Sequence, residues 1–215
     1  MNNTTSEFGI PQAKVDFSRF EFAPVVRYEG SWFVFDLTDR YDPEFIEDKV
    51  YGIGRYNEKR KHMYVAEQFE GRRNIHMGID IWTPAAEPVY AFYKGEIAYF
   101  TDHDQPGNYG PTIVTRHDFD GKALFALHGH LSRASLEGLE VGEHFETGGK
   151  IAEIGDKIVN GGWSPHLHFQ ISFEDPGKAD MPGVVAEEER EKAVRRYPDP
   201  RLVLGELYRG ANPLR

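Results

Sequence analysis

The sequence contains no cysteine among its 215 residues. This absence excludes disulfide bonds, zinc sites built from thiolates and a cysteine nucleophile. Any metal site must therefore use the carboxylates and the nine histidines, which are ligands that borderline metals such as zinc accept.

Positive charge is also scarce, because 25 Lys and Arg residues face 35 Asp and Glu residues, a formal net charge of −10. This balance argues against nucleic acid or an anionic membrane as the main partner. The chain lacks an apolar window of about 18 residues, the length that a transmembrane helix needs. Charged residues such as Glu7, Lys14 and Asp16 interrupt the stretch where a secretory signal would lie. We therefore predict a cytoplasmic location, with the oligomeric state open.

Composition favours a turn-rich, mainly β protein. Hydrophobic residues make up 40% of the chain and aromatics 13%, and there are 22 Gly and 13 Pro. Short β-type runs, separated by Gly and Pro, occupy residues 87–100, 111–118, 122–131, 144–155 and 166–173. The connections between them are too short for the crossover helices of a parallel sheet. We expect an antiparallel β-sheet core, a barrel or a sandwich, with short helices in the flanking segments.

Three zones divide the chain. Residues 1–60 form a predicted β-containing extension packed on the core, with a strand at 31–35. Residues 61–175 carry the β runs and the histidine motifs. Residues 176–215 are predicted to hold a solvated helix at 186–196 and an apolar tether.

Histidine placement is the most informative feature. Five of the nine histidines, together with one aspartate, form three short groups with even spacing: His76 with Asp80, His128 with His130, and His166 with His168. Because side chains alternate along a strand, residues at even spacing share a face. His76 and Asp80 would be up to ~13 Å apart on a straight strand, so a shared ion requires a bend, which Gly78 permits.

Two histidines and one carboxylate would leave a fourth zinc position for water, which is the arrangement of a catalytic site. Zinc lowers the pKa of bound water from 15.7 to about 7. A single H-x-H in a β protein is more often an ordinary strand segment. Three such groups together, in a chain without cysteine, indicate a metal site.

The motifs resemble, in order, those of the lysostaphin-type (LytM-like) zinc metallopeptidase family. Over residues 74–173 they read HMGIDIWTPAAEPVYAFYKGEI, YGPTIVTRHD, LFALHGHLS, VGEHFETGGKIAEIG and PHLHFQIS. Members of that family mostly cut the peptide cross-links of bacterial cell walls. The resemblance implies a small antiparallel β core related to the barrel-sandwich hybrids.

The resemblance also implies roles for individual residues. His76, Asp80 and His168 match the Zn²⁺ ligands, and His130 and His166 match the two catalytic histidines. One of the latter would be the general base and the other would stabilise the oxyanion, with the assignment open. The implied reaction is hydrolysis of an amide bond by a metal-bound water, in a peptide or a peptidoglycan-like substrate. The sequence has no H-E-x-x-H motif, so no glutamate base is expected.

Several features depart from the family pattern. Trp163, in NGGWSP, is expected to lie beside the site. Trp163 and Tyr109 are expected to contact the substrate. His128 is additional, and it either orients a ligand or a base or is a buried structural residue. The C-terminal run DMPGVVAEEEREKAVRRYPDPRLVLGE resembles a branch whose members look cytoplasmic and stand alone or are fused to aminotransferase-like and kinase-like domains. This context leaves open whether the substrate is cell wall.

Two alternatives remain. The chain could be a non-catalytic or latent zinc-binding module whose groove is covered by residues 1–60 and 175–215. It could also carry phosphate on paired histidines, but the Asp80 carboxylate would repel a phosphate and suits a cation.

Overall fold

The computed structural model describes residues 15–48, 50–65 and 69–207, and its architecture is mainly β. The first 14 residues of the predicted extension and the end of the predicted tether lie outside this range. Within it, the largest sheet has eight strands, in the order β1 (Phe33–Val34), β2 (Gly52–Gly54), β4 (Ile79–Trp82), β11 (His166–Ser172), β8 (Lys122–Gly129), β7 (Gly110–Phe119), β6 (Gly95–His103) and β9 (His144–Phe145). All neighbours are antiparallel except β1 and β2. The predicted antiparallel core is confirmed, and the sheet does not close into a barrel.

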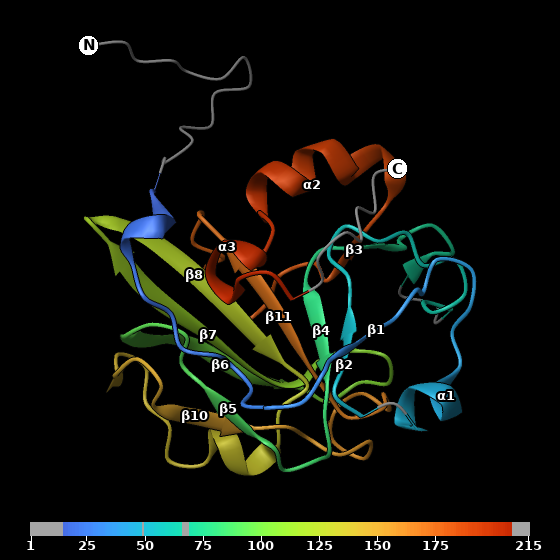
Figure 1. Ribbon diagram of the computed structural model, residues 1–215, viewed down its shortest axis with the longest axis horizontal. Helices are drawn as coiled ribbons and strands as arrows, with labels where there is room; N and C mark the ends of the chain where they lie inside the picture. Colours follow the sequence, from blue (N-terminus) through green and yellow to red (C-terminus); the bar gives the residue numbers. More distant parts are fainter. Residues whose placement is uncertain (1–14, 49, 66–68, 208–215) are drawn as a thin grey trace.

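Two small sheets and several short helices complete the fold (Figure 1). The small sheets are β10 (Lys150–Glu153) with β5 (Pro88–Tyr90), and β12 (Val184–Val185) with β3 (Ile75–His76). The helices are α1 (Pro43–Asp48), α2 (Arg190–Arg196) and α3 (Arg201–Leu204), with 3-10 turns η1 (Phe17–Arg19), η3 (Arg133–Leu136) and η4 (Glu187–Glu189). Helix α2 ends at Arg196 with Tyr197 as its C-cap, because Pro198 disfavours a helical conformation at the preceding residue. No helix among the described residues is long and apolar enough to cross a membrane.

Strand alternation gives the large sheet two different faces. On β8, Leu124 and Ala126 belong to one buried cluster, whereas Phe125 and Leu127 belong to another. The register of β11 against β8 pairs Phe169 with His128 and His168 with Gly129. Phe169 therefore points toward the first cluster, and His168 toward the opposite face.

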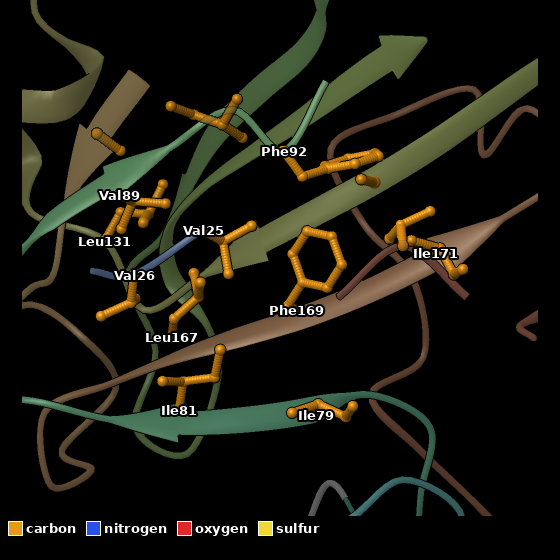
Figure 2. Close-up of a cluster of buried hydrophobic side chains, with 14 of the residues drawn as sticks. Val25, Val26, Ile79, Ile81, Val89, Phe92, Leu131, Leu167, Phe169 and Ile171 are labelled. Atoms are coloured by element: carbon orange, nitrogen blue, oxygen red, sulfur yellow. The ribbon is translucent and has the colours of Figure 1, made fainter. Parts of the chain in front are cut away.

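The first cluster is the main hydrophobic core. Figure 2 shows Ile79 and Ile81 of β4 beside Leu167, Phe169 and Ile171 of β11. Across from them lie Val25, Val26, Val89 and Phe92, so the N-terminal segment covers this face. Phe20 extends the cover through an edge contact with Phe119, with ring centroids 4.9 Å apart. This apolar face leaves polar chemistry to the other side of the sheet.

Both flanking segments are joined to the strands that carry His76 and Asp80. Strands β1 and β2, from the N-terminal zone, extend the main sheet beyond β4. Residues 57–60 run beside β3, where the Asn57 amide donates to the His76 carbonyl and the His76 amide donates to the Glu58 carbonyl. Strand β12, from the C-terminal zone, pairs with β3 through Val184 and His76. Residues on both sides of the motif region thus position the first histidine group.

Candidate metal centre

Three side chains converge at the edge between β3, β4 and β11. His76 Nε2 lies 3.1 Å from His168 Nδ1, and Asp80 Oδ1 lies 3.1 Å from the first and 3.0 Å from the second. Ligands bound to one tetrahedral zinc at about 2.05 Å are separated by about 3.3 Å, so this triangle has the size of a zinc ligand set. Among the described residues, these three form the one group of His, Cys, Asp or Glu that could hold a metal ion.

A break between β3 and β4 brings the first two ligands together. Strand β3 ends at His76 and β4 begins at Ile79, so the chain bends between the two ligands as their spacing requires. A Cβ atom at Gly78 would lie 2.5 Å from Cε1 of His168, so a larger residue would collide with the third ligand. The register of β11 against β4 then pairs His168 directly with Asp80.

Each ligand has its other polar atom fixed by a neighbour. His76 Nδ1 donates to the Arg55 carbonyl at 2.9 Å, which leaves Nε2 as the ligand atom. His168 Nε2 lies 3.0 Å from Gln170 Oε1, which leaves Nδ1 for the metal. Arg60 Nη1 donates to Asp80 Oδ2 at 2.6 Å, which leaves Oδ1. Such outer contacts orient metal ligands and select their tautomers.

Buried charges lie directly behind Asp80. The side chains of Arg60 and Glu58 are both 0% exposed and form an ion pair at 3.0 Å, and Glu58 also binds Arg55. Burial alone raises the pKa of Asp80, but His76 and the Arg60 cation outweigh it and hold that pKa well below its ordinary value. Burial, and then the Arg60 charge, lower the pKa of His76 to about 4. Asp80 is therefore ionised and His76 neutral, the forms that bind metal.

His130 and His166 lie beside the triangle with ring centroids 4.1 Å apart. His166 Nε2 is 3.8 Å from Asp80 Oδ1. His130 Nδ1 donates to the Asn160 carbonyl at 2.9 Å, and His166 Nδ1 donates to the Ser164 carbonyl at 2.7 Å. Because a carbonyl oxygen can only accept, each Nδ1 carries the hydrogen and each Nε2 is left as an acceptor.

The loop that holds His130 is itself tightly built. The Asn160 side chain donates to the Trp163 carbonyl and accepts from the Trp163 amide. Gly161 has φ +85°, and a Cβ atom there would lie 2.0 Å from the Asn108 carbonyl oxygen. The NGGW segment thus needs glycine to pass close to Asn108. Burial is the main cause that lowers the pKa of both His130 and His166.

A cleft of about 310 Å³ opens onto these residues. Its wall includes the metal triangle, His130, His166, Tyr109 and Trp163, the residues that the sequence places at the site, with one exception. Tyr109 Oη lies 3.5 Å from His168 Nε2 and donates to the Met181 carbonyl. Trp163 packs near Tyr41 and Tyr64, at centroid distances of 6.2 and 6.1 Å. Met63, Tyr64, Phe69 and residues 180–184 supply the flanking walls.

The exception is His128, which the structure does not bring to the site. Even spacing predicts that His128 and His130 share a face, but β8 ends at Gly129 and His130 has φ +63°. The left-handed backbone turns the His130 side chain toward the cleft, whereas His128 faces the core against Phe169, with centroids 5.2 Å apart. Neither ring nitrogen of His128 makes a well-aligned hydrogen bond with a described residue, although the backbone groups of Ile113 and Ala126 lie close enough to raise its pKa. This placement fits the alternative of a buried structural histidine.

Several supporting residues escape sequence reasoning. Gln170 follows His168 by two residues in HLHFQ, so strand alternation alone could have assigned it to the ligand face. Arg55, Glu58 and Arg60 carry no recognisable motif, and only the pairing of residues 57–60 beside β3 brings them to Asp80.

Comparisons with known proteins point to one family. The model of peptidase family M23 matches residues 74–181, half of the chain. A zinc-containing peptidase from Vibrio cholerae is similar, with 29% identity and a TM-score of 0.42 over 54% of this chain and 31% of that one. The catalytic domain of the antimicrobial peptidase lysostaphin from Staphylococcus simulans shows 20% identity and a TM-score of 0.45, covering 71% of this chain and 99% of that one.

A mutant catalytic domain of the prophage-encoded M23 protein EnpA from Enterococcus faecalis is also similar. It shows 20% identity and a TM-score of 0.43, covering 62% of this chain and 85% of that one. The chain thus spans about a third of the Vibrio cholerae protein and most of each of these two catalytic domains. No curated protein matches the chain.

Proposed function

The chain belongs to peptidase family M23, and on that premise we propose that it hydrolyses peptide bonds with a zinc ion held by His76, Asp80 and His168. The observation that carries the proposal is the triangle of three ligand atoms, each 3.0 to 3.1 Å from the others, at the wall of the cleft. The donor set suits zinc, since imidazole and carboxylate are common ligands of that ion.

Zinc bound there would supply Lewis-acid chemistry: it lowers the pKa of a coordinated water and polarises a carbonyl oxygen. The protein's own contribution comes from His130 and His166. With Nδ1 of each ring committed to a backbone carbonyl, each Nε2 can accept a proton from water and later return it to the leaving amine. A protonated ring of the pair can instead donate to the developing oxyanion.

The walls of the cleft support a peptide as substrate. Tyr109 and Trp163 offer aromatic surface beside the histidines, and we propose that they contact the substrate. A peptide or peptidoglycan-like substrate and a cytoplasmic location are both predictions. Digestion of purified cell wall and fractionation of the source cells would test these two points.

The ligand set is tested by zinc content. We expect about one zinc per chain by atomic absorption in the wild type and loss of that zinc in His168→Ala. His144→Ala is the matched control, because His144 is exposed on β9, away from the cleft. Equal zinc in wild type and His168→Ala would contradict the assigned ligands, and absence of hydrolysis of every peptide by zinc-loaded wild type would contradict the activity.

The alternative of a latent module rests on a separate observation. The four site histidines and Asp80 are at most 5% exposed. Residues 180–184 of the C-terminal zone line the cleft, whereas no described residue of 1–60 does. A latent form predicts that zinc binds at full occupancy while peptides are cut only after residues of the flanks are removed. Limited proteolysis followed by a peptide-cleavage assay distinguishes the two cases.

A further inference from the structure

One cation in the cleft, that of Arg73, has no polar partner among the described residues. The Arg73 guanidinium has neither a hydrogen bond nor an ion pair with any described residue, whereas every other arginine of the described ranges has one or the other. The chain carries ten more carboxylates than cations. An unpaired arginine in so acidic a protein calls for a ligand of its own.

Arg73 is partly buried, which makes the missing partner more significant. Its Nε atom is shielded from solvent and has no acceptor among the described residues. The guanidinium lies over the Phe69 ring, with Cζ 5.8 Å from the ring centroid. A buried donor without an acceptor is unfavourable, and an incoming acceptor would relieve it.

The same cleft contains both Arg73 and the metal triangle. Among the described residues that line it, Arg73 is the one Lys or Arg. The two carboxylates of the wall already have cationic partners, because Asp80 binds Arg60 and Asp180 lies 2.8 Å from Lys178. The charge of Arg73 is therefore free to attract an anion into the cleft, where apolar neighbours such as Met63 and Phe69 strengthen it.

Arg73 also lies near the reacting centre along the chain. It precedes the ligand His76 by three residues, so their Cα atoms are at most about 11 Å apart. An extended peptide advances about 3.3 Å per residue. Because Arg73 and the triangle line one cleft, a group bound by Arg73 belongs to a residue a few positions from the scissile bond.

We propose that Arg73 binds a carboxylate of the substrate, so that the protein prefers peptides with an acidic group a few residues from the bond that it cuts. This inference rests on the proposed peptide hydrolysis. The guanidinium fork matches a carboxylate through two parallel hydrogen bonds. The carboxylate can belong to an Asp or Glu side chain or to the C-terminus of the peptide, and the experiment separates these sources.

The test uses the full-length, zinc-loaded protein and two pools of random octapeptides, one with free C-terminal carboxylates and one amidated. Mass spectrometry identifies the cut sites. Enrichment of Asp and Glu over Asn and Gln in both pools would assign a side-chain carboxylate. Cleavage confined to the first pool, a few residues from the terminus, would assign the terminal carboxylate. Single pairs of acid and amide peptides then give the ratio of kcat/KM.

We expect this ratio to be about 10 to 100 in the wild type, the factor for a hydrogen bond to a charged group. It should fall to about 1 in Arg73→Met, mainly through KM, and lie between these values in Arg73→Lys. Arg72→Met is the matched control, because Arg72 is 64% exposed and pairs with Glu70, and its ratio should equal that of the wild type. A wild-type ratio near 1, or a ratio that Arg73→Met leaves unchanged, overturns the proposal.

The carboxylate site can be judged even if hydrolysis fails. If no peptide is cut, the same pools are passed over the immobilised full-length protein and the retained peptides are sequenced. Retention of acidic peptides by wild type and Arg72→Met, but not by Arg73→Met, would support the carboxylate site while the proposed hydrolysis fails. Equal retention by wild type and Arg73→Met would overturn the site as well.

Discussion

Two groups of buried histidines lie on opposite faces of one sheet. His166 and His168 share the face of β11 that lines the cleft. His128 faces the apolar core, as does His117, because Ile113, the partner of His128, lies four residues before His117 on β7. All four are at most 3% exposed, so burial does not separate them.

The difference lies in the ring nitrogens. In the cleft, one nitrogen of each ring is held by the protein and the other faces the metal triangle or open space. In the core, His117 uses both nitrogens, on the Lys94 carbonyl and the Thr115 hydroxyl, and His128 uses neither. A free nitrogen held in place beside a carboxylate therefore distinguishes the histidines of the cleft from those of the core.

The largest expected effect is on kcat, and it tests whether the cleft histidines, unlike the core histidines, transfer protons. His166→Gln should retain zinc and lower kcat by about 10²- to 10⁴-fold, because a positioned acid or base contributes that factor. His117→Gln, the core control, should leave kcat per folded molecule unchanged. Steady-state kinetics with parallel zinc measurements checks both. Similar kcat values for His166→Gln and wild type would remove His166 from the reaction.

The second effect concerns the buried ion pairs that Arg60 forms with Glu58 and Asp80 on the cleft side of the sheet. Arg60→Met leaves Glu58 and the outer oxygen of Asp80 without their buried cation. We expect the free energy of unfolding to fall by about 3 to 5 kcal/mol, as for other broken buried ion pairs. Urea unfolding measures the loss.

A compensating variant tests the cause of that loss. Arg60→Met combined with Glu58→Met removes one of the two buried carboxylates that lose Arg60 and should recover part of the stability, since Arg55, the other partner of Glu58, keeps its contact with Asp36. A double variant less stable than Arg60→Met would show that packing, and not the unpaired charge, explains the loss.

The third effect measures how much the contact between Gln170 and His168 Nε2 contributes to zinc affinity. Gln170→Leu removes the partner of His168 Nε2, so the ring loses the contact that selects its tautomer. We expect zinc affinity to weaken about 10- to 100-fold, the usual range for such partners of metal ligands. Competition with a chelator measures the affinity. An unchanged dissociation constant would show that the strand alone orients His168.

The smallest effect is in the core, where the two histidines should respond with opposite signs. His128→Leu removes two buried nitrogens that make no well-aligned hydrogen bond with a described residue, so at pH 7 the free energy of unfolding should rise by about 1 kcal/mol. His117→Leu strands the groups that His117 binds and should lower it by a similar amount. Urea unfolding at pH 7 compares them, and equal signs would contradict the assignment.

His128 also makes stability depend on pH. Burial, and then the nearby His117, lower its pKa to about 3, whereas an unfolded imidazole titrates near pH 6.5. The unfolded chain therefore binds more protons between these values, and stability falls as pH falls through this window. His128→Leu should reduce the slope between pH 6 and 4 by up to about 1.4 kcal/mol per pH unit.

Much of the fold class and of the donor set could be predicted from the residues alone. Period-two runs between Gly and Pro predict the strands, and each of the five predicted runs overlaps a strand by four or more residues. The two-residue spacing of His166 and His168 needs only strand alternation to put both on one face. Gln170 follows from the same rule.

The prediction fails where the chain leaves regular structure. His128 and His130 have the same spacing as His166 and His168, yet they diverge because His130 lies beyond β8 in a left-handed conformation. Spacing along a strand says nothing about a residue one step past its end.

The sequence by itself determined which atoms a metal site could use, since a chain without cysteine has only His, Asp and Glu to offer. The tertiary structure alone decided which of them meet: the bend at Gly78, the pairing of β4 with β11 and the passage of residues 57–60 beside β3. It also decided that Arg60 binds Asp80, whereas Arg73 has no polar partner in the described part of the chain. The reason is physical, because propensity and alternation act over a few residues, whereas these contacts join segments that only packing brings together.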